Sequence, residues 1–498
     1  MTNNKFTIIF PIIADAITQI CTHKIWANRD EIAQYILDNL AKYNAASPPV
    51  FDASIDTHQG VANFVDWFSA WFTQQNEAVL PYIATFERIK LNVPTEKQAQ
   101  REVWAYRPFT GWLPNFSTQE MKLTQICLNG YKSIGAKDTT IELGDITILL
   151  GANGVGKSNL ISFFNLLYHI VNGSLQTHVA AEGYADTFLY LGQKQTQSIH
   201  AHLTFEHGES VCTYELSLMH GAGDKLLIQK EAVTYQQNRT EPPFPPPIST
   251  AERESNLLSM ARQGKPESAI TQLLGMVFRL LDNCKVYHFQ DTSVHAKVRQ
   301  QGYIEDNRLL HADANNLAAF LYRLKENSHT YSDYQKIVRY ITMAMPQFGD
   351  FDLFPNGQNQ RYISLNWHEA NHLNYLFGSH QISDGSLRFM CLATLLLQPA
   401  HLLPRIIVLD EPELGLHPSA IAYLNAMLFT ASQHAQIIIA TQSPRLVDES
   451  EVNSIVVVER VDNASVFVRK REEDLAVWLE DYSLSELWEK NVIGGLPW

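Results

Sequence analysis

The stretch GANGVGKS, residues 151–158, restricts the possible folds of this chain more than any other feature. The apolar run ITILL before it predicts a buried strand, and SNLISFFNLLYHI after it has the spacing of a helix. A G-x-x-x-x-G-K-[ST] loop between strand and helix holds phosphate oxygens on its backbone N–H groups. Lys157 would reach the β- and γ-phosphates, and Ser158 would supply a Mg²⁺ ligand. The nucleotide contacts predicted for this loop are Asn153, Gly154, Gly156, Lys157, Ser158 and Asn159.

A second predicted strand ends in two acids. Residues 406–409, IIVL, have the β-branched bias of a buried parallel strand, and Asp410 and Glu411 follow at its carboxyl end. Open α/β sheets place their ligands at that end of the strands. Asp410 would orient the Mg²⁺ shell, and Glu411 would act as general base on the attacking water. The alternative is that both acids are solvated charges of a loop. The presence of a phosphate loop in the same chain makes this alternative less favoured.

Two more strands are predicted to end in polar groups. AQIIIATQSPRL ends its apolar run at Thr441-Gln442-Ser443, one crossover helix after Asp410, so Gln442 is expected near the γ-phosphate and the attacking water. KVYHFQDTS, residues 285–293, brings Gln290 or Asp291 to the same edge as a Mg²⁺ sensor. A structural role for both residues remains an equal alternative.

The stretch QISDGSLRFMCLATLLL, residues 381–397, predicts a polar turn at the start of an apolar helix. The helix dipole, the serine hydroxyls and a glycine N–H suit a γ-phosphate. One sheet crevice binds one nucleotide, so we expect this turn to meet the phosphate held by a second copy of the chain. The alternative is a helix cap without a ligand. The predicted contacts are Ser383, Gly385 and Ser386.

The overall composition describes a globular protein of several domains. The chain has 498 residues, 45% hydrophobic and 18% charged, with a net charge of −14 that argues against a general polyanion-binding surface. Five scattered cysteines without a CxxC pair fit reduced core thiols. No stretch approaches the roughly 18 apolar residues of a membrane span. We therefore expect a cytoplasmic protein with no membrane partner.

Residues 1–115 predict a small α+β domain that resembles a winged helix. Helices are predicted over residues 11–23, 29–40 and 58–74, and strands over residues 82–92 and 101–108. Such domains often bind DNA. However, the region has nine Lys and Arg against eleven Asp and Glu, so the charge pattern of DNA binding is missing. DNA contact and protein docking both stay open for this domain.

The remaining sequence predicts a self-sufficient module over residues 121–498, with an inserted lobe around residues 175–380. Residues 107–120 read as a linker, and EPPFPPPIS, residues 241–249, reads as an exposed loop. Residues 199–219 alternate as a hairpin, and residues 267–283 and 315–328 have helical spacing. The predicted fold is α/β, with a mixed sheet and a helical lobe.

These motifs, in this order, resemble the ABC-type head ATPases of the SMC and RecF kind over residues 121–498. The matching stretches are NGYKSI, the phosphate loop, ISDGSLR as signature, LDEPELGLHP as Walker B, and ATQSP as switch. The resemblance implies a P-loop head that binds ATP and Mg²⁺. It also implies a homodimer, or a higher oligomer, in which ATP is sandwiched between the signature of one head and the Walker site of the other.

Within that class the chain is most similar to the ATPase subunits of bacterial antiphage defence systems, such as Septu, retron-associated and PARIS-like systems. HADANNLAAFLYRL and the tail WLEDYSLSELWEKNVIGGLPW carry this closer likeness. It implies an ATPase that acts as sensor and scaffold for a separate nuclease or toxin subunit. A RecF-like DNA-repair ATPase and a non-catalytic nucleotide sensor are the alternatives.

The sequence departs from the family pattern at two positions. Many ABC proteins have a histidine at the switch, where this chain has Gln442, and an aspartate after the Walker B loop, where it has His417. A glutamine can hold a water but cannot accept its proton, so we expect slow hydrolysis. About fifty residues follow the switch, too few for the TOPRIM nuclease domain of OLD-type relatives.

Overall fold

The computed structural model describes residues 27–28, 86–94, 100–108, 121–135, 139–236, 247–249, 253–263, 269–357 and 359–495. The chain divides into two compact units. The first comprises Met1–Ser117 and Ser259–Met276, and the second comprises Thr118–Leu258 and Val277–Trp498. The motifs of the predicted nucleotide site all lie in the second unit.

The described part of residues 1–117 is an antiparallel three-stranded sheet. Strand β1 (Ala27–Asn28) pairs with β3 (Gln100–Pro108), which pairs with β2 (Phe86–Pro94). The two predicted strands are therefore confirmed. β3 includes the first two residues of the predicted linker 107–120, so that boundary was wrong. The three predicted helices lie outside the described residues, and the winged-helix assignment stays a prediction.

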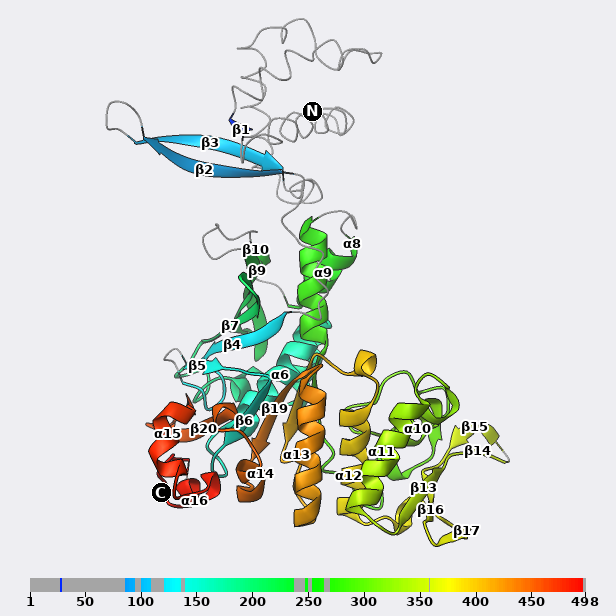
Figure 1. Ribbon diagram of the computed structural model, residues 1–498. Coiled ribbons are helices and arrows are strands. Elements are labelled where there is room, and N and C mark those ends of the chain that lie inside the picture. Colours follow the sequence, from blue (N-terminus) through cyan, green and yellow to red (C-terminus); the bar gives the residue numbers. More distant parts are fainter. Residues whose placement is uncertain are drawn as a thin grey trace, which may run out of the picture. The chain divides into compact units, whose positions relative to one another are not determined.

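A six-stranded sheet, here called the central sheet, carries the motifs (Figure 1). Five neighbouring strands are parallel, and the last is antiparallel to its neighbour. Residues Ile406–Leu409 and all six residues of β19 are buried, as near-continuous apolar runs predict. In spatial order the strands are β11 (Cys284–Tyr287), β18 (Ile406–Asp410), β19 (Gln436–Thr441), β6 (Ile146–Leu150), β20 (Ile455–Val461) and β21 (Ala464–Arg469).

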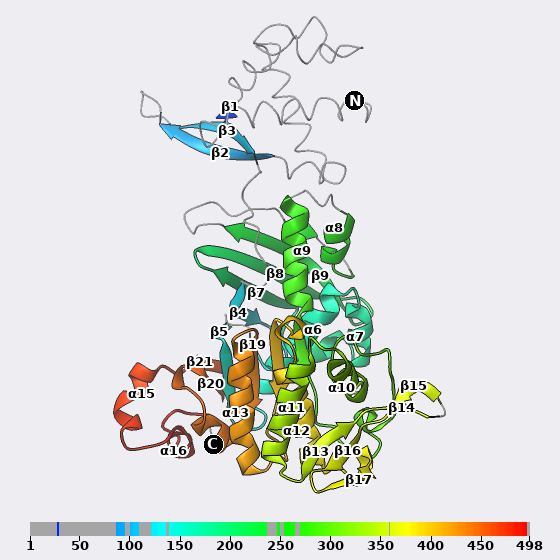
Figure 2. The ribbon, with the colours of Figure 1, turned by 45° about the vertical axis from the view of Figure 1, so that its right-hand side comes forward.

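Helices connect and cover the central sheet. Helix α6 (Lys157–Val171) contacts β11, β18 and β19, and α13 (Pro418–Ser432), the crossover between β18 and β19, contacts β6 and β19. Beside α13 lies α12 (Asp384–Leu397), which also packs on α11 (Tyr331–Ala344) (Figure 2). Among the described residues, no helix combines the length and the apolar character that crossing a membrane requires.

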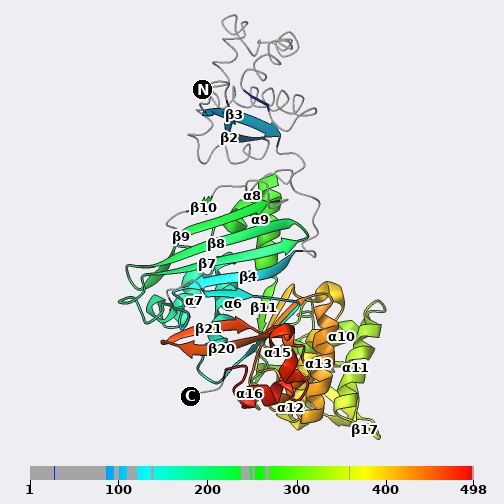
Figure 3. The ribbon, with the colours of Figure 1, turned by 60° about the vertical axis from the view of Figure 1, so that its left-hand side comes forward.

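A second six-stranded sheet, here called the antiparallel sheet, belongs to the same unit (Figure 3). The predicted hairpin is confirmed as β7 and β8. The exposed loop predicted for 241–249 is wrong at its end, because Pro247–Ser249 forms an edge strand, where proline is tolerated in a sheet. In spatial order the strands are β10 (Pro247–Ser249), β9 (Lys225–Gln236), β8 (Ser210–Gly221), β7 (Ser198–His207), β4 (Lys122–Asn129) and β5 (Thr139–Glu142).

Residues 175–380 contribute to several parts of the fold. Strands β7 to β10 extend the antiparallel sheet, and β11 forms one edge of the central sheet. The predicted helices appear as α9 (Ala269–Asp282) and α10 (Leu317–Glu326), alongside α7 (Leu175–Ala181) and α8 (Leu257–Gln263). Two small sheets complete the region, made of β12 (Gly302–Tyr303), β15 (Asn359–Ile363) and β14 (Pro355–Asn356), and of β13 (Phe348–Asp352), β16 (Asn366–Glu369) and β17 (His372–Phe377).

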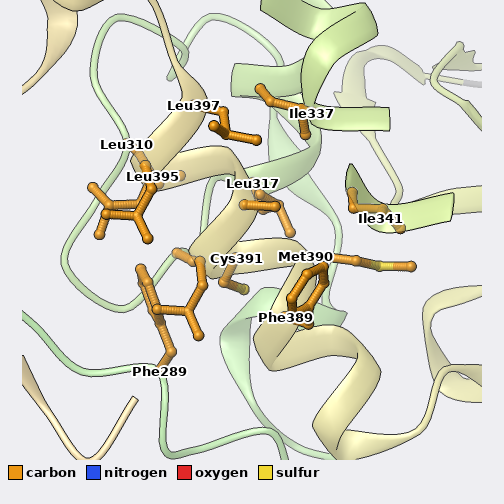
Figure 4. Close-up of a cluster of buried hydrophobic side chains, with 14 of the residues drawn as sticks. Phe289, Leu310, Leu317, Ile337, Ile341, Phe389, Met390, Cys391, Leu395 and Leu397 are labelled. Atoms are coloured by element: carbon orange, nitrogen blue, oxygen red, sulfur yellow. The ribbon is translucent and has the colours of Figure 1, made fainter. Parts of the chain in front are cut away.

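A large hydrophobic cluster fastens this region to the central sheet. Side chains from α10, α11 and α12 meet those of β18, β19 and α13 in one buried cluster. In Figure 4, Phe389, Met390 and Cys391 of α12 lie among Phe289, Leu317 and Ile341. The helix that begins at the signature turn is therefore anchored along its length in the core, and its polar start is held in a fixed place.

The C-terminal residues pack against the part of the central sheet that contains β6 and β20. Helices α14 (Pro444–Asp448), α15 (Glu472–Leu479) and α16 (Leu484–Glu489) share a buried cluster with Leu150 and strand β20. Beyond α16, the carbonyl of Gly495 accepts a hydrogen bond of 2.8 Å from the Ala152 N–H. The tail thus supports the start of the phosphate loop.

Candidate nucleotide site

The topology of the central sheet brings four polar loops to one edge. The carboxyl ends of β11, β18, β19 and β6 are neighbours, with Asp410 paired to Ala440 and Thr441 paired to Leu150. Because these strands are parallel, the residues that follow them meet at the same edge. This edge holds the predicted nucleotide loop, Walker B acids, switch and Gln290.

The phosphate loop is closed by two serines that the sequence pattern did not single out. Gly156, the N-cap of α6, has φ of 113°, and a Cβ there would lie 2.0 Å from the Ser465 Oγ and 2.5 Å from the Ser133 Oγ. The Ser465 hydroxyl donates to the Val155 carbonyl at 2.6 Å. Asn159, predicted to contact nucleotide, donates its side-chain N–H to Ser133 Oγ at 2.7 Å, so in this structure it braces the loop.

Lys157 lies inside the loop. Its ammonium donates to the carbonyls of Gly151, at 2.6 Å, and Ala152, at 2.8 Å, and the residue is only 5% exposed. Burial lowers the pKa of Lys157, while the nearby carboxylates, Glu411 foremost, act to raise it. This places a positive charge with little access to water beside the loop that is predicted to hold phosphates.

Ser158 and Asp410, the two predicted Mg²⁺ ligands, lie beside each other. Burial raises the pKa of Asp410, and the Ser158 hydroxyl partly offsets this. A hydroxyl and a carboxylate side by side are the hard oxygen donors that Mg²⁺ prefers, so these residues fit the ion.

The structure separates Gln290 from Asp291. The Gln290 side-chain amide donates to the carbonyl of Asp410 at 3.3 Å. The Asp291 carboxylate instead accepts hydrogen bonds from the backbone N–H and the hydroxyl of Ser293, and so closes its own turn. Of the two candidates for a metal sensor, only Gln290 is hydrogen-bonded to the Walker B strand.

Gln442 joins the switch to both nucleotide loops. Its side-chain N–H group donates to Glu411 Oε1 at 2.5 Å and to Asn153 Oδ1 at 2.6 Å. Glu411 has φ of 45°, a left-handed backbone that non-glycine residues adopt infrequently, and its N–H donates to the Ala440 carbonyl. The predicted base is therefore held in a specific orientation by β19 and by the switch.

Glu413 is a further acid at the site that sequence reasoning missed. It accepts a hydrogen bond from the Thr441 hydroxyl at 2.5 Å, and burial raises its pKa. Among the described residues, its Oε2 is one of the few buried side-chain oxygens without a partner. Its place two residues after Glu411, in DEPE, was the available signal.

The signature turn caps α12 as predicted. The Ser383 Oγ accepts a hydrogen bond from the Ser386 N–H at 3.2 Å. A contact within the same chain explains why residue 385 is a glycine. A Cβ on Gly385 would lie 2.2 Å from the carbonyl oxygen of Gly415, in the loop after Walker B. Among the hydrogen bonds of the described residues, none joins the turn to the phosphate loop of its own chain.

Two arginines absent from the sequence prediction hold this turn. Arg388, in α12 and buried, donates to the carbonyls of Phe289 and Gln290, each at 3.0 Å, and to that of Leu414. Arg299 donates to Asp384 Oδ1 at 2.8 Å and to the Ile382 carbonyl at 3.0 Å. The signature turn is thereby connected to the loops after β11 and β18.

His417 occupies a structural position. It is the N-cap of α13, where its side chain accepts from the Ser419 N–H and its Nδ1 lies 2.7 Å from the Ser419 hydroxyl oxygen. The histidine that replaces the family's usual aspartate therefore caps the crossover helix.

The comparisons with known proteins show what part of this chain is similar to. Residues 290–448 match the family model described as "AAA domain, putative AbiEii toxin, Type IV TA system". No curated protein matched the sequence.

Solved structures with similarity include SMC heads. A head bound to the C-winged helix domain of ScpA has a TM-score of 0.46 and 14% identity, covering 71% of this chain and 99% of that one. An Smc head domain with an extended coiled coil bound to the C-terminal domain of ScpA, derived from Pyrococcus furiosus, has a TM-score of 0.46 and 14% identity, covering 72% of this chain and 99% of that one. The SMC head domain from Thermotoga maritima has a TM-score of 0.39 and 16% identity, covering 70% of this chain and 99% of that one.

The family match spans the signature, the Walker B strand and the switch, and the phosphate loop lies beside them at one sheet edge. Over residues 290–448 the chain is therefore similar to an AAA domain, which is a type of P-loop ATPase domain.

Proposed function

We propose that this protein is a Mg²⁺-dependent ATPase whose two copies enclose ATP and which controls a separate nuclease or toxin in an antiphage defence complex. The observation that carries the proposal is the meeting of Lys157, Asp410, Glu411 and Gln442 at one sheet edge. These groups supply phosphate binding, metal binding, a base and a group that positions water.

Each side chain has a task in hydrolysis. The Lys157 ammonium neutralises charge on the β- and γ-phosphates. Ser158 and Asp410 would hold Mg²⁺, which, when bound, withdraws charge from the phosphate oxygens. Glu411 accepts the proton of the attacking water, while its Oε1 is held by Gln442. Because the Gln442 amide cannot accept a proton, Glu411 is the proton acceptor of the pair, and turnover is slow.

The dimer follows from the signature turn. Its serines and the start of α12 suit an anion, and its described hydrogen bonds lie with Arg299 and within the turn. A second copy of the chain would supply the phosphate that this turn meets. The defence role is supported by the sequence resemblance and by the description of the matching family model, which names a toxin–antitoxin system.

One observation favours a second candidate, a nucleotide sensor with little turnover. The Gln442 amide is hydrogen-bonded to the base that should activate water. If this bond persists with ATP bound, the protein switches state on binding and release. Single-turnover hydrolysis separates the two candidates, since a sensor releases ATP unchanged.

The test of the proposed function is the molar mass of the protein in solution with and without Mg²⁺–ATP, together with phosphate release. ATP should double the mass of the parent. Glu411→Gln should keep the ATP-bound dimer and lose about 10²–10⁴-fold in turnover. Lys157→Ala should remain unchanged in mass at any ATP concentration. A parent that neither assembles nor releases phosphate would refute the proposal.

The shared site is tested at Ser383. Gly385 is unsuitable, because any side chain there would collide with Gly415 of its own chain. Ser383→Asp keeps a helix-capping oxygen and adds a negative charge, whereas Ser383→Asn is the neutral control of the same size. Only the aspartate variant should lose assembly, while both bind ATP. Mixed with Lys157→Ala chains, it should regain part of the turnover through one intact composite site.

A further inference from the structure

Two carboxylates of the Walker B loop hold the same turn. Glu411 accepts a hydrogen bond from the side-chain N–H of Gln442 at 2.5 Å. Glu413, two residues later, accepts one from the hydroxyl of Thr441, the residue before Gln442. The switch turn is thus held at two neighbouring residues, at the Gln442 amide and at the Thr441 hydroxyl.

The turn is braced further along the chain as well. Thr441 Oγ1, which donates its proton to Glu413, accepts a hydrogen bond from the Ser443 N–H at 3.0 Å. Ser443 in turn caps α14 by accepting from Leu446 N–H at 3.3 Å. A displacement of Glu413 would therefore move the three successive residues Thr441, Gln442 and Ser443.

Glu413 is only partly buried as a residue, but its Oε2 is buried, and a buried carboxylate oxygen without a partner costs free energy. Burial disfavours the charged form, and the Oε2 of Glu413 has no partner among the described residues. Glu413 lies close enough to Glu411 and Lys157 for its charge to act on both. This arrangement suits a group that serves the chemistry of the site more than one that only adds stability.

We propose that Glu413 is a positioning residue for ATP hydrolysis, which holds Thr441 and thereby the switch turn, so that the Gln442 amide lies between Glu411 and Asn153. The inference rests on the proposed function, because it assigns Gln442 and Glu411 their roles with the attacking water. Glu413 acts through Gln442 and touches neither substrate nor metal.

The test uses the full-length protein with Mg²⁺–ATP and compares Glu413→Ala, Glu413→Gln, Gln442→Ala and the double variant Glu413→Ala/Gln442→Ala. The glutamine keeps an oxygen for the hydrogen bond from Thr441. The matched control is Asp448→Ala. Asp448, the last residue of α14, accepts hydrogen bonds from the hydroxyl of Ser485 at 2.6 Å and from its backbone N–H at 2.8 Å, so it too is a carboxylate that holds a hydroxyl residue.

Glu413→Ala should lower kcat by about 10–100-fold and change the affinity for ATP by less than about threefold. Glu413→Gln should recover most of that loss. The double variant should lose no more than Gln442→Ala, because groups that act as a unit are not additive. Asp448→Ala should leave kcat unchanged.

The inference is overturned if Glu413→Ala retains the parental kcat, or if the losses of the two single variants multiply. Amide hydrogen exchange in the absence of nucleotide gives an independent readout. The Ser443 N–H, whose acceptor is Thr441 Oγ1, should exchange at least about tenfold faster in Glu413→Ala, because Glu413 no longer holds the Thr441 hydroxyl. An unchanged exchange rate also overturns the inference. A parent without turnover would refute the proposed function, and hydrogen exchange would still decide whether the clamp exists.

Discussion

The two six-stranded sheets of the second unit have the same number of strands but different chemistry. In the central sheet five neighbouring strands are parallel, so the loops after β6, β11, β18 and β19 all leave one edge. In the antiparallel sheet successive strands run in opposite directions, so their loops alternate between two edges. Only the first arrangement gathers polar residues from distant segments at one place.

Burial differs between the sheets in a related way. The strands β18 and β19 are buried almost throughout, while β7 and β8 alternate buried and mostly half-buried residues along much of their length. The antiparallel sheet nevertheless buries one acid, Glu231, which is 0% exposed. We infer that charge at the central sheet serves ligand chemistry, and that charge at the antiparallel sheet affects stability.

The largest effect should come from Lys157, which begins α6 at the loop that follows β6 of the central sheet. Lys157→Ala removes the charged donor of the phosphate loop, so affinity for ATP should fall by about 100-fold or more. Isothermal titration with ATP measures this. Lys230→Ala is the control, because Lys230 forms an exposed ion pair with Glu215 in the antiparallel sheet. Equal losses of ATP affinity in Lys157→Ala and Lys230→Ala would contradict the inference that only charge at the central sheet serves ligand binding.

The junction of the sheets is the next place to test. Gln436 is buried, accepts from the Leu123 N–H at 2.7 Å and donates to the Leu123 carbonyl at 2.9 Å, so it joins β19 to β4. Gln436→Leu leaves these backbone groups without partners and should cost about 2 kcal/mol of unfolding free energy. Urea unfolding measures it. The exposed Gln229→Leu, which loses one bond from Ser217, should change stability far less.

Glu231 should make stability depend on pH. Burial raises the pKa of its carboxyl above the ordinary 4.5, although Ser255 and Tyr214 donate hydrogen bonds to it. The folded state therefore retains a proton that the unfolded chain releases, so this group's contribution to stability falls as pH rises from about 4.5 to the folded pKa.

Glu231→Gln cannot ionise, so it should remove this group's share of the change in unfolding free energy between pH 4 and pH 8. Thermal or urea unfolding at several pH values provides the comparison. The ATP affinity of the variant should match the parent, since the residue belongs to the antiparallel sheet. A variant with the same pH slope as the parent would show that Glu231 is ionised when folded.

The smallest effect is expected at the surface of the sheet junction. Lys122 Nζ lies 2.5 Å from Asp145 Oδ1, and both side chains are 55% exposed. Water screens such pairs, so Lys122→Ala should cost about 0.5 kcal/mol or less. The same urea experiment applies, with Gln436→Leu as the reference for a buried bridge. A larger loss at Lys122 than at Gln436 would reverse this ranking.

The sequence alone predicted the features that depend on residues close together in the chain. A strand, a glycine-rich loop and a helix are encoded within residues 146–171, and the structure confirms β6 and α6 there. Asp410 at the end of β18 and the turn after β19 follow from apolar runs that end in polar residues. Ser383 as helix cap is a local hydrogen bond of the same kind.

Only the tertiary structure could decide which distant groups meet. Ser465 closes the phosphate loop from more than three hundred residues away, and a glycine at 156 is required by that contact. The choice between Gln290 and Asp291 depends on which side chain faces β18, and Gly385 is needed because Gly415 approaches it. The sequence DEPE indicates an acid at Glu413, but its partner, Thr441, becomes evident only when β19 lies beside β18. The physical reason is that spacing along a chain specifies strands and caps, while hydrogen bonds between separate segments depend on how the strands are ordered in the sheet.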